Sequence, residues 1–128
     1  MKLDKDLIRD ILLAVEASDH DPRGFMELEI EGRTRAELSY HVKILDDAGF
    51  LEAEDLSTLG PDGFEWQPQA LTYRGHEFLE TVRDSAVWQA TKQGAEKAGT
   101  ASVALIWEIG KAVAKNMISD RLGITIGE

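Results

Sequence analysis

The first part of the chain has a helical spacing of apolar residues, followed by the alternation of a strand. Residues 18–24 contain Pro and Gly and predict a loop between two elements. Before this loop, apolar residues recur at the spacing of one helical face, and either Asp4 or Asp6 can cap the helix. The face consists of Leu7, Ile8, Ile11, Leu12 and Val15. After the loop, residues 25–31 alternate apolar and acidic side chains and predict a half-buried strand that ends at Gly32.

A capping box marks the start of the next helix. Thr34 and Glu37 have the spacing at which each side chain satisfies a free backbone N–H group of the other. The apolar face that follows consists of Leu38, Val42 and Leu45. Gly49 is a natural left-handed stop, so the pattern predicts a helix over residues 34–48.

A hairpin is predicted after this helix. Residues 50–57 and 64–67 have strand character, and the run Gly60-Pro61-Asp62-Gly63 between them is typical of a turn. Pro68 has no N–H group to donate, so we expect it in an edge strand or at the end of the second strand.

The remainder of the chain is predicted to be helical. The expected helices cover residues 72–84, 85–98 and 101–119. Thr72 is the expected cap of the first of them. Trp88 lies far around a helix from Val82, so we expect a break between the first two helices, with Ser85 as the next cap. Residues 124–126 predict a short strand-like tail.

This order of elements predicts an α+β fold with additional C-terminal helices. Helix, strand, helix and hairpin follow each other as in a winged-helix-like domain, which presents a helix beside a β-hairpin wing. We expect residues 1–128 to form a single domain, with the winged-helix-like part and its acidic wing over residues 1–70. Residues 71–128 then form a helical part. Because Ile30 and Leu38 are close in sequence, the first helix of a helix-turn-helix is absent or reduced to a turn.

Several sequence blocks resemble those of a known protein family. They are Leu7-Ile8-Arg9, Tyr40-His41-x-Lys43-x-Leu45-x-x-Ala48-Gly49 and Leu71-Thr72-x-x-Gly75-His76-Glu77-Phe78-Leu79, followed by Arg83-Asp84 and Trp88. With this spacing, residues 1–95 resemble a family of small bacterial and phage proteins known as domain of unknown function 2513. The resemblance implies a winged-helix-like fold and a prophage or mobile-element context. That family has no agreed activity, so the resemblance implies no catalytic residue.

Acidic residues outnumber basic ones, and the excess lies in the first part of the chain. The sequence has 24 Asp and Glu against 14 Lys and Arg, a formal charge of -10. Residues 1–70 hold 17 acidic and 7 basic side chains, whereas residues 71–128 hold 7 of each. No Lys or Arg occurs between Lys43 and Arg74. These counts exclude a generally cationic nucleic-acid binder, so any contact with nucleic acid must be local.

Composition narrows the class of protein further. The chain has no cysteine, which excludes disulfides, thiolate zinc sites and a cysteine nucleophile. The longest apolar run, residues 103–107, is far shorter than a membrane span, and no secretory signal is evident. We therefore expect a cytoplasmic protein without membrane contact. No motif for catalysis, a cofactor or a small-molecule substrate occurs, so we expect a non-enzymatic protein without a cofactor.

The helix after the capping box carries the residues of a DNA-binding hypothesis. The candidate contacts are Arg33, Arg35, Ser39, Tyr40 and Lys43. The arginines lie at the helix N-terminus, where phosphate also meets free N–H groups, and the tyrosine and lysine project outward. These residues predict a small regulator that binds DNA as a dimer, and the family resemblance implies that it is of the phage or prophage type. Alternatively, Lys43 pairs with Asp47 and the arginines pair with neighbouring acids.

The acidic hairpin opposes DNA binding and supports a second hypothesis. Its carboxylates are Glu52, Glu54, Asp55, Asp62 and Glu65. In a winged-helix arrangement they approach the phosphates and work against binding by counterion release. The alternative function is an acidic protein–protein interaction module, inhibitory or DNA-mimicking, that docks a basic partner through the wing. A plain solvated acidic face that aids solubility explains the same charges.

The last predicted helix has more apolar surface than a small domain can cover. The residues expected at an interface with a second copy are Leu105, Ile106, Ile109, Gly110, Val113 and Met117. We therefore expect a homodimer. The alternative is burial of this helix within one chain.

The three histidines do not predict a metal site. His41 and His76 lack partners at ligand spacing and lie at the margins of apolar faces, so we expect them to make structural hydrogen bonds. His20 lies between Asp19 and Asp21 in a loop, which favours weak adventitious metal binding at most.

Overall fold

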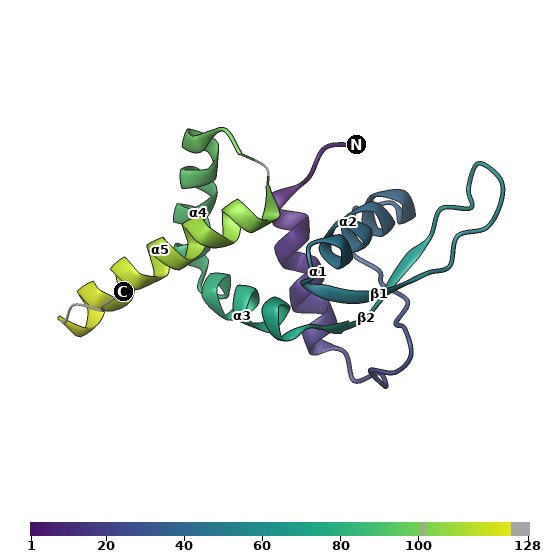
Figure 1. The fold of residues 1–128 in the computed structure, drawn as a ribbon, viewed down its shortest axis with the longest axis horizontal. Helices are drawn as coiled ribbons and strands as arrows, with labels where there is room; N and C mark the ends of the chain where they lie inside the picture. The colour runs from purple at the N-terminus through teal and green to yellow at the C-terminus, as the bar shows by residue number, and fades with distance from the viewer. Residues whose placement is uncertain (101, 124–128) are drawn as a thin grey trace. The chain divides into compact units, whose positions relative to one another are not determined.

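The computed structural model describes residues 1–100 and 102–123, and the tail predicted over residues 124–126 lies outside them. The regular structure in these residues is five α-helices and a two-stranded antiparallel sheet, an α+β arrangement as the sequence predicts (Figure 1). The chain divides into two compact units, Met1–His76 and Glu77–Glu128. We call them unit 1 and unit 2.

Helix α1 (Lys5–Ala17) begins at one of the two expected caps. The Asp4 carboxylate accepts a hydrogen bond from Leu7 N–H at 3.1 Å, so the cap is Asp4 and not Asp6. The apolar residues of the predicted face are all buried. The predicted helical period is therefore confirmed.

Helix α2 (Arg35–Asp47) begins with the predicted capping box. Thr34 Oγ1 accepts a hydrogen bond from Glu37 N–H at 3.1 Å, and Glu37 Oε1 accepts one from Thr34 N–H at 3.2 Å. The buried face includes the predicted Leu38, Val42 and Leu45. Gly49 follows with a φ of 84°, a left-handed conformation in which glycine carries no Cβ strain.

Strands β1 (Leu51–Asp55) and β2 (Trp66–Leu71) form an antiparallel hairpin. Their pairing shifts between Glu52 and Ala53, and Pro68 lies opposite Ala53. The second strand therefore continues past the proline, where we predicted its end. Of the two places expected for this proline, the edge strand is correct, since an edge or a bulge tolerates a residue without an N–H group.

Residues 25–31 do not form the predicted strand. Met26 N–H donates to the Pro68 carbonyl at 2.9 Å, as in a strand ladder. Leu28 N–H, however, donates to the side-chain oxygen of Gln67 at 2.9 Å instead of to a backbone carbonyl. The predicted alternation of burial is present, because Leu28 is buried and the acidic residues on both sides of it are exposed.

Two groups on β2 explain why the ladder stops. The Pro68 carbonyl accepts a hydrogen bond from Met26, but Pro68 has no N–H group with which to donate a second one to residues 25–31. Trp66 N–H donates to Ser39 Oγ at 3.1 Å, so a side chain of α2 takes the place of a third strand. The prediction of a strand was wrong because these pairings join residues far apart in the sequence.

Helix α3 (Tyr73–Val82) begins close to the backbone at the start of the hairpin. Thr72 Oγ1 accepts a hydrogen bond from Gly75 N–H at 3.0 Å, which confirms the predicted cap. A Cβ on Gly75 would lie 2.0 Å from the Phe50 carbonyl oxygen. Glycine is therefore required here by the close approach of two backbones.

Helices α4 (Ser85–Ala98) and α5 (Val103–Leu122) contact each other in unit 2. The predicted break between α3 and α4 is present, but its cap is Asp84 and not Ser85. The Asp84 carboxylate accepts two backbone N–H groups of the first turn of α4. Helix α5 continues beyond the end expected near Ser119.

We expect Gly75→Ala to destabilise the protein strongly. Its methyl group meets a backbone carbonyl that cannot rotate away, at a cost of about 2 kcal/mol after the gain in helix propensity. Urea unfolding followed by circular dichroism measures the change. Gly24→Ala is the matched control, because its Cβ would meet only an ordinary contact at 3.7 Å. Equal stability of the two variants contradicts the argument.

Candidate functional site

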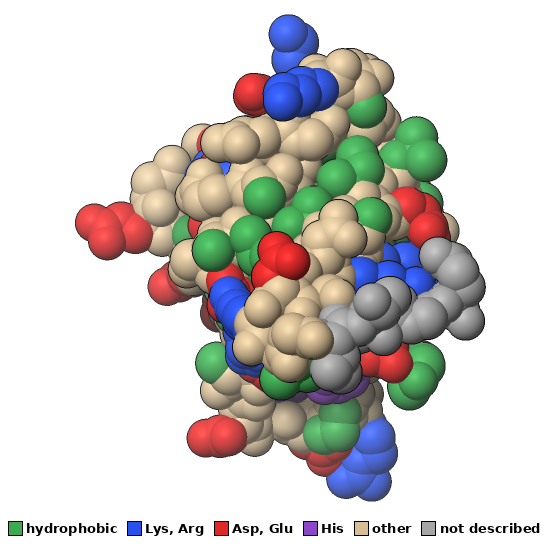
Figure 2. Space-filling model, turned by 90° about the vertical axis from the view of Figure 1, so that its left-hand side faces the viewer, with side chains coloured by type: hydrophobic (Ala, Val, Ile, Leu, Met, Phe, Trp, Pro, Cys, Tyr) green, Lys and Arg blue, Asp and Glu red, His purple; other side chains and the backbone are tan. Residues whose placement is uncertain are grey.

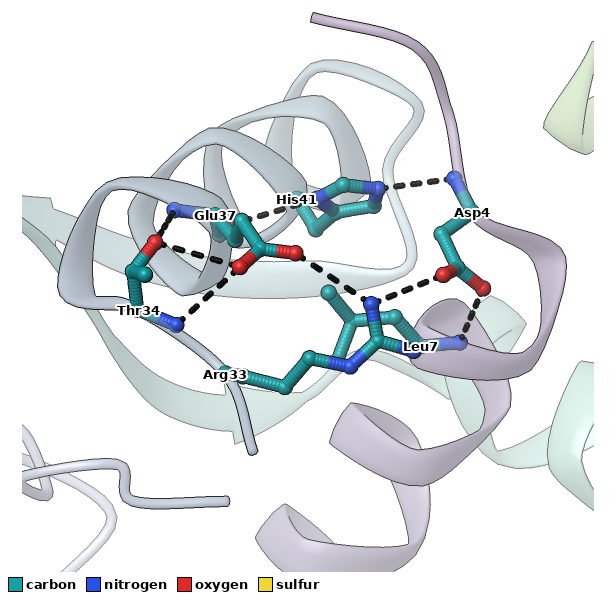
Figure 3. A network of polar contacts seen from close by, with 6 residues as sticks. All are labelled: Asp4, Leu7, Arg33, Thr34, Glu37 and His41. Atoms are coloured by element: carbon teal, nitrogen blue, oxygen red, sulfur yellow. Dashed lines mark hydrogen bonds and ion pairs between the residues drawn. The ribbon is translucent and has the colours of Figure 1, made fainter. Parts of the chain in front are cut away.

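Four residues join the starts of α1 and α2, and we call them the α1–α2 clasp: Asp4, Arg33, Glu37 and His41 (Figure 3). Arg33 Nη1 lies 2.8 Å from Asp4 Oδ2 and 3.3 Å from Glu37 Oε2. Asp4 N–H donates to His41 Nε2 at 2.9 Å, and His41 Nδ1 donates to the Glu37 carbonyl at 2.8 Å. The clasp therefore ties the start of α1 to Arg33, just before α2, and to Glu37 and His41 in the first two turns of α2.

The charged groups of the clasp are held in their ionised forms. Burial raises the pKa of Asp4, but hydrogen bonds from Arg33 and Leu7 N–H outweigh it and hold that pKa below its ordinary value. Hydrogen bonds from the Thr34 backbone and from Arg33 lower the pKa of Glu37. The hydrogen bond to Asp4 raises the pKa of Arg33. Arg33 is thus a structural cation and not a free phosphate contact.

His41 makes the structural hydrogen bonds expected of it. Its side chain is buried, with 1% exposed, and both ring nitrogens are used. Because a backbone N–H donates to Nε2, the ring proton lies on Nδ1. Neither nitrogen is available to a metal or a substrate.

The other two histidines differ from each other. His20 is bonded on both sides, to Ser18 Oγ through Nδ1 and to the Gln69 carbonyl through Nε2, so it joins a loop to β2. His76 is exposed on α3, and the structural hydrogen bond expected of it stays a prediction. Among residues 1–100 and 102–123, no group of three or more His, Asp or Glu side chains could hold a metal ion.

The outward cations of α2 are also paired with carboxylates. Lys43 Nζ lies 2.9 Å from Asp47 Oδ2, and this hydrogen bond raises the pKa of Lys43. Arg35 Nη1 lies 3.8 Å from Glu65 Oε1 on the hairpin. The alternative interpretation of these residues, in which each cation pairs with a neighbouring acid, is confirmed.

Ser39 and Tyr40 are not free on the surface of α2. Ser39 is 1% exposed, and its hydroxyl accepts the Trp66 N–H group described above. It cannot reach a DNA base or phosphate in this fold, which corrects its place among the candidate contacts. Tyr40 is half-buried, with its ring edge-on to the His41 ring at 5.7 Å between centroids.

A groove of about 640 Å³ runs along the start of α2, between residues 27–31 and the base of the hairpin. Its charged lining is Glu27, Glu29, Glu31, Arg33, Arg35 and Glu65. A second hollow of about 470 Å³ lies between the first turn of α2 and the hairpin loop, where Asp62 and Phe64 line it. Arg35 lines both hollows.

The hairpin itself is acidic and carries apolar groups near its tip. Glu52, Asp55 and Asp62 are exposed, whereas Glu54 and Glu65 are half-buried. The hydrogen bond from Ser57 lowers the pKa of Asp55, so it too is ionised at neutral pH. Leu59 is fully exposed, at 102%, and Phe64 is 40% exposed.

The residues expected at a dimer interface differ in how far they are buried. Ile106 and Gly110 are buried, and a Cβ on Gly110 would meet Val82 at 3.2 Å, so its own chain already covers that position. Leu105 is 53% exposed. Ile109, Val113 and Met117 are half-buried. On the face shown in Figure 2, apolar side chains lie exposed among charges of both signs.

The described fold is that of a small α+β protein with a hairpin packed against helix α2. The chain matches the model of the family described as hypothetical protein (DUF2513) over residues 2–101, and it belongs to that family. It is 34% identical over 122 residues to an uncharacterized protein of Haemophilus influenzae, covering 95% of this chain and 99% of that protein. No solved structure matches the chain. No helix in the described residues is long and apolar enough to cross a membrane.

The residues that carry the family resemblance support the fold. His41 closes the clasp, Gly49 ends α2 in a left-handed conformation, and Gly75 allows the close approach to Phe50. None of these roles exposes a reactive atom. The candidate binding surface is therefore the acidic groove and the hairpin, and not the residues that carry the resemblance.

Asp4→Asn tests the clasp, because asparagine can still cap α1 but cannot form the ion pair with Arg33. The pKa of Asp4 is lowered in the folded protein, so its negative charge stabilises the fold at pH values above the ordinary pKa of aspartate. This contribution is lost as the pH falls through the pKa of the folded state. We expect the variant to unfold at a lower temperature than the wild type at neutral pH, with the difference shrinking at about pH 3.

Thermal unfolding at the two pH values measures this effect. Asp10→Asn, on the exposed side of α1, is the control for the loss of one negative charge. A deficit in the Asp4 variant that is equally large in acid would contradict the role of the ion pair.

Proposed function

We propose that this protein is a non-enzymatic binding module that docks a basic segment of a partner protein on the acidic face of unit 1. The observation that carries the proposal is that each cation needed for DNA binding is already paired. Arg33, Arg35 and Lys43 lie 2.8, 3.8 and 2.9 Å from carboxylate oxygens. The carboxylates of the hairpin outnumber these cations, so the surface has negative charge left over.

Long-range electrostatics support a basic partner over nucleic acid. Exposed Glu52, Asp55 and Asp62 project from a stretch that contains no Lys or Arg between Lys43 and Arg74. Such a surface repels phosphate and accelerates the approach of a cationic protein, with the effect weakening as salt increases.

Apolar groups on the hairpin supply the other part of an interface. Leu59 and Phe64 are exposed within the acidic surface. Protein interfaces combine apolar anchors with a polar rim, so a basic segment with neighbouring apolar side chains fits this face. Charge then selects the partner, and the apolar contacts slow its dissociation.

The arrangement of unit 1 supports a winged-helix-like assignment. Helix α1, residues 25–31, α2 and the hairpin follow the order of that fold, with residues 56–65 as the tip of the wing. The missing first helix of the usual motif leaves α2 held by the clasp and by Ser39.

We propose a cytoplasmic protein that forms a homodimer through the exposed part of α5.

A second candidate is a dimeric DNA-binding regulator of the phage or prophage type. One observation favours it: the Lys43–Asp47 pair is exposed, with 40% and 54% of the side chains accessible, so a phosphate could replace Asp47. In this case Arg35 must also leave Glu65. The carboxylates of the hairpin would repel the phosphates of DNA, whereas they would attract the basic partner of the first candidate.

Charge reversal at two positions distinguishes the candidates. On the first, Glu54→Lys weakens binding of an arginine-rich peptide by about tenfold at low salt, whereas Lys43→Glu leaves it unchanged or slightly tighter. On the second, Lys43→Glu weakens binding to mixed-sequence duplex DNA. Fluorescence anisotropy with both labelled probes at two salt concentrations measures the constants. Salt-dependent duplex binding that Lys43→Glu abolishes, with no peptide binding, contradicts the first candidate.

A further inference from the structure

We infer that the groove along α2 receives an extended partner segment with basic side chains at alternate positions, and that Arg35 occupies this place when the partner is absent. The inference rests on the proposed function and specifies how the partner binds. Its basis is the groove of about 640 Å³, the spacing of its glutamates and the loose ion pair of Arg35.

Residues 27–31 set the spacing along one wall of the groove. Leu28 is buried between the exposed Glu27 and Glu29, which is the alternation of an extended chain, and the exposed Glu31 follows in a turn. Alternate residues of such a chain lie roughly 6.5 to 7 Å apart. An extended partner segment has the same repeat. Lysine or arginine at every second position therefore meets the Glu27 and Glu29 carboxylates in register, and Glu31 adds negative charge at the end of the groove.

Side chains, not main-chain pairing, carry this recognition. The Leu28 N–H group already donates to Gln67, and the Trp66 N–H group already donates to Ser39. Gln67 and Ser39 are buried, with 5% and 1% exposed. An added strand finds neither N–H group free, so strand addition at β2 is disfavoured and charge pairing is the remaining source of specificity.

Arg35 differs from Arg33 in how firmly it is held. Arg33 is 24% exposed and lies 2.8 Å from Asp4, whereas Arg35 is 65% exposed and 3.8 Å from Glu65. An ion pair at this distance, with an exposed guanidinium, contributes little to stability and is easily exchanged. Arg35 lines both hollows, so its guanidinium lies where a partner cation would meet Glu65. It is an internal competitor for the groove.

The test uses the full chain and two synthetic peptides of equal length and composition. In one peptide arginine alternates with serine, and in the other the arginines form one block. Titration calorimetry at low salt and at about physiological ionic strength gives the affinities. We expect the alternating peptide to bind about fivefold more tightly, because more of its cations face one wall.

Variants identify the groove. Glu29→Gln is expected to weaken binding of the alternating peptide about two- to fivefold, and Arg35→Gln to tighten it by a similar factor. Glu96→Gln and Lys97→Gln make the same charge changes at exposed positions of α4 and control for net charge. Circular dichroism checks that all four variants fold.

The outcomes separate this inference from the proposed function. If both peptides bind equally, and Glu29→Gln and Arg35→Gln match their controls, the inference is overturned while the binding module remains. If neither peptide binds even at low salt, the proposed function is overturned as well. Weaker binding by Arg35→Gln would show that Arg35 contacts the ligand directly and would overturn its role as a competitor.

Discussion

The hydrogen bonds between the His41 ring, the Asp4 backbone and the Glu37 carbonyl fix α1 against α2, and the rest of unit 1 is built around that junction. Breaking a buried bond of this kind leaves a polar group unsatisfied, at a cost of about 1–3 kcal/mol. Arg33 adds an ion pair to the same junction and bonds the acid that closes the capping box. One cluster therefore sets the start of both helices.

Ion pairs within unit 1, of which the clasp is one, determine the charge left on its surface. Arg33 is used inside the fold, and Lys43 and Arg35 are balanced by acids on α2 and the hairpin. What remains outside is mainly carboxylate. In the winged-helix-like arrangement that we propose, a helix is presented beside a hairpin, but with this charge the surface suits a cationic partner better than a polyanion.

The local features of the fold follow from the sequence because they depend on residues within one helical turn. The capping box at Thr34, the apolar face of α1 and the break before α4 are of this kind. The cap of α4 was misplaced by one residue, since both Asp84 and Ser85 are suitable capping residues and local pattern does not rank them.

Long-range pairings could not be predicted in the same way. His41 and Asp4 are 37 positions apart, and Trp66 and Ser39 are 27 apart. No periodicity links such residues. The strand expected over residues 25–31 failed for this reason, and Ser39 proved to be buried. For the candidate site, the excess of acid was evident from the sequence, but the glutamate-lined groove beside α2 required the structure.

The most direct measurement is an NMR titration of the ¹⁵N-labelled protein with an arginine-rich peptide, followed by the same titration with duplex DNA. Binding on the acidic face predicts that the peptide shifts the amide signals of residues 27–31, Arg35 and Glu65, while DNA leaves them unchanged. Peptide-induced shifts confined to α4 and α5, or DNA-induced shifts along α2 with none from the peptide, would contradict it.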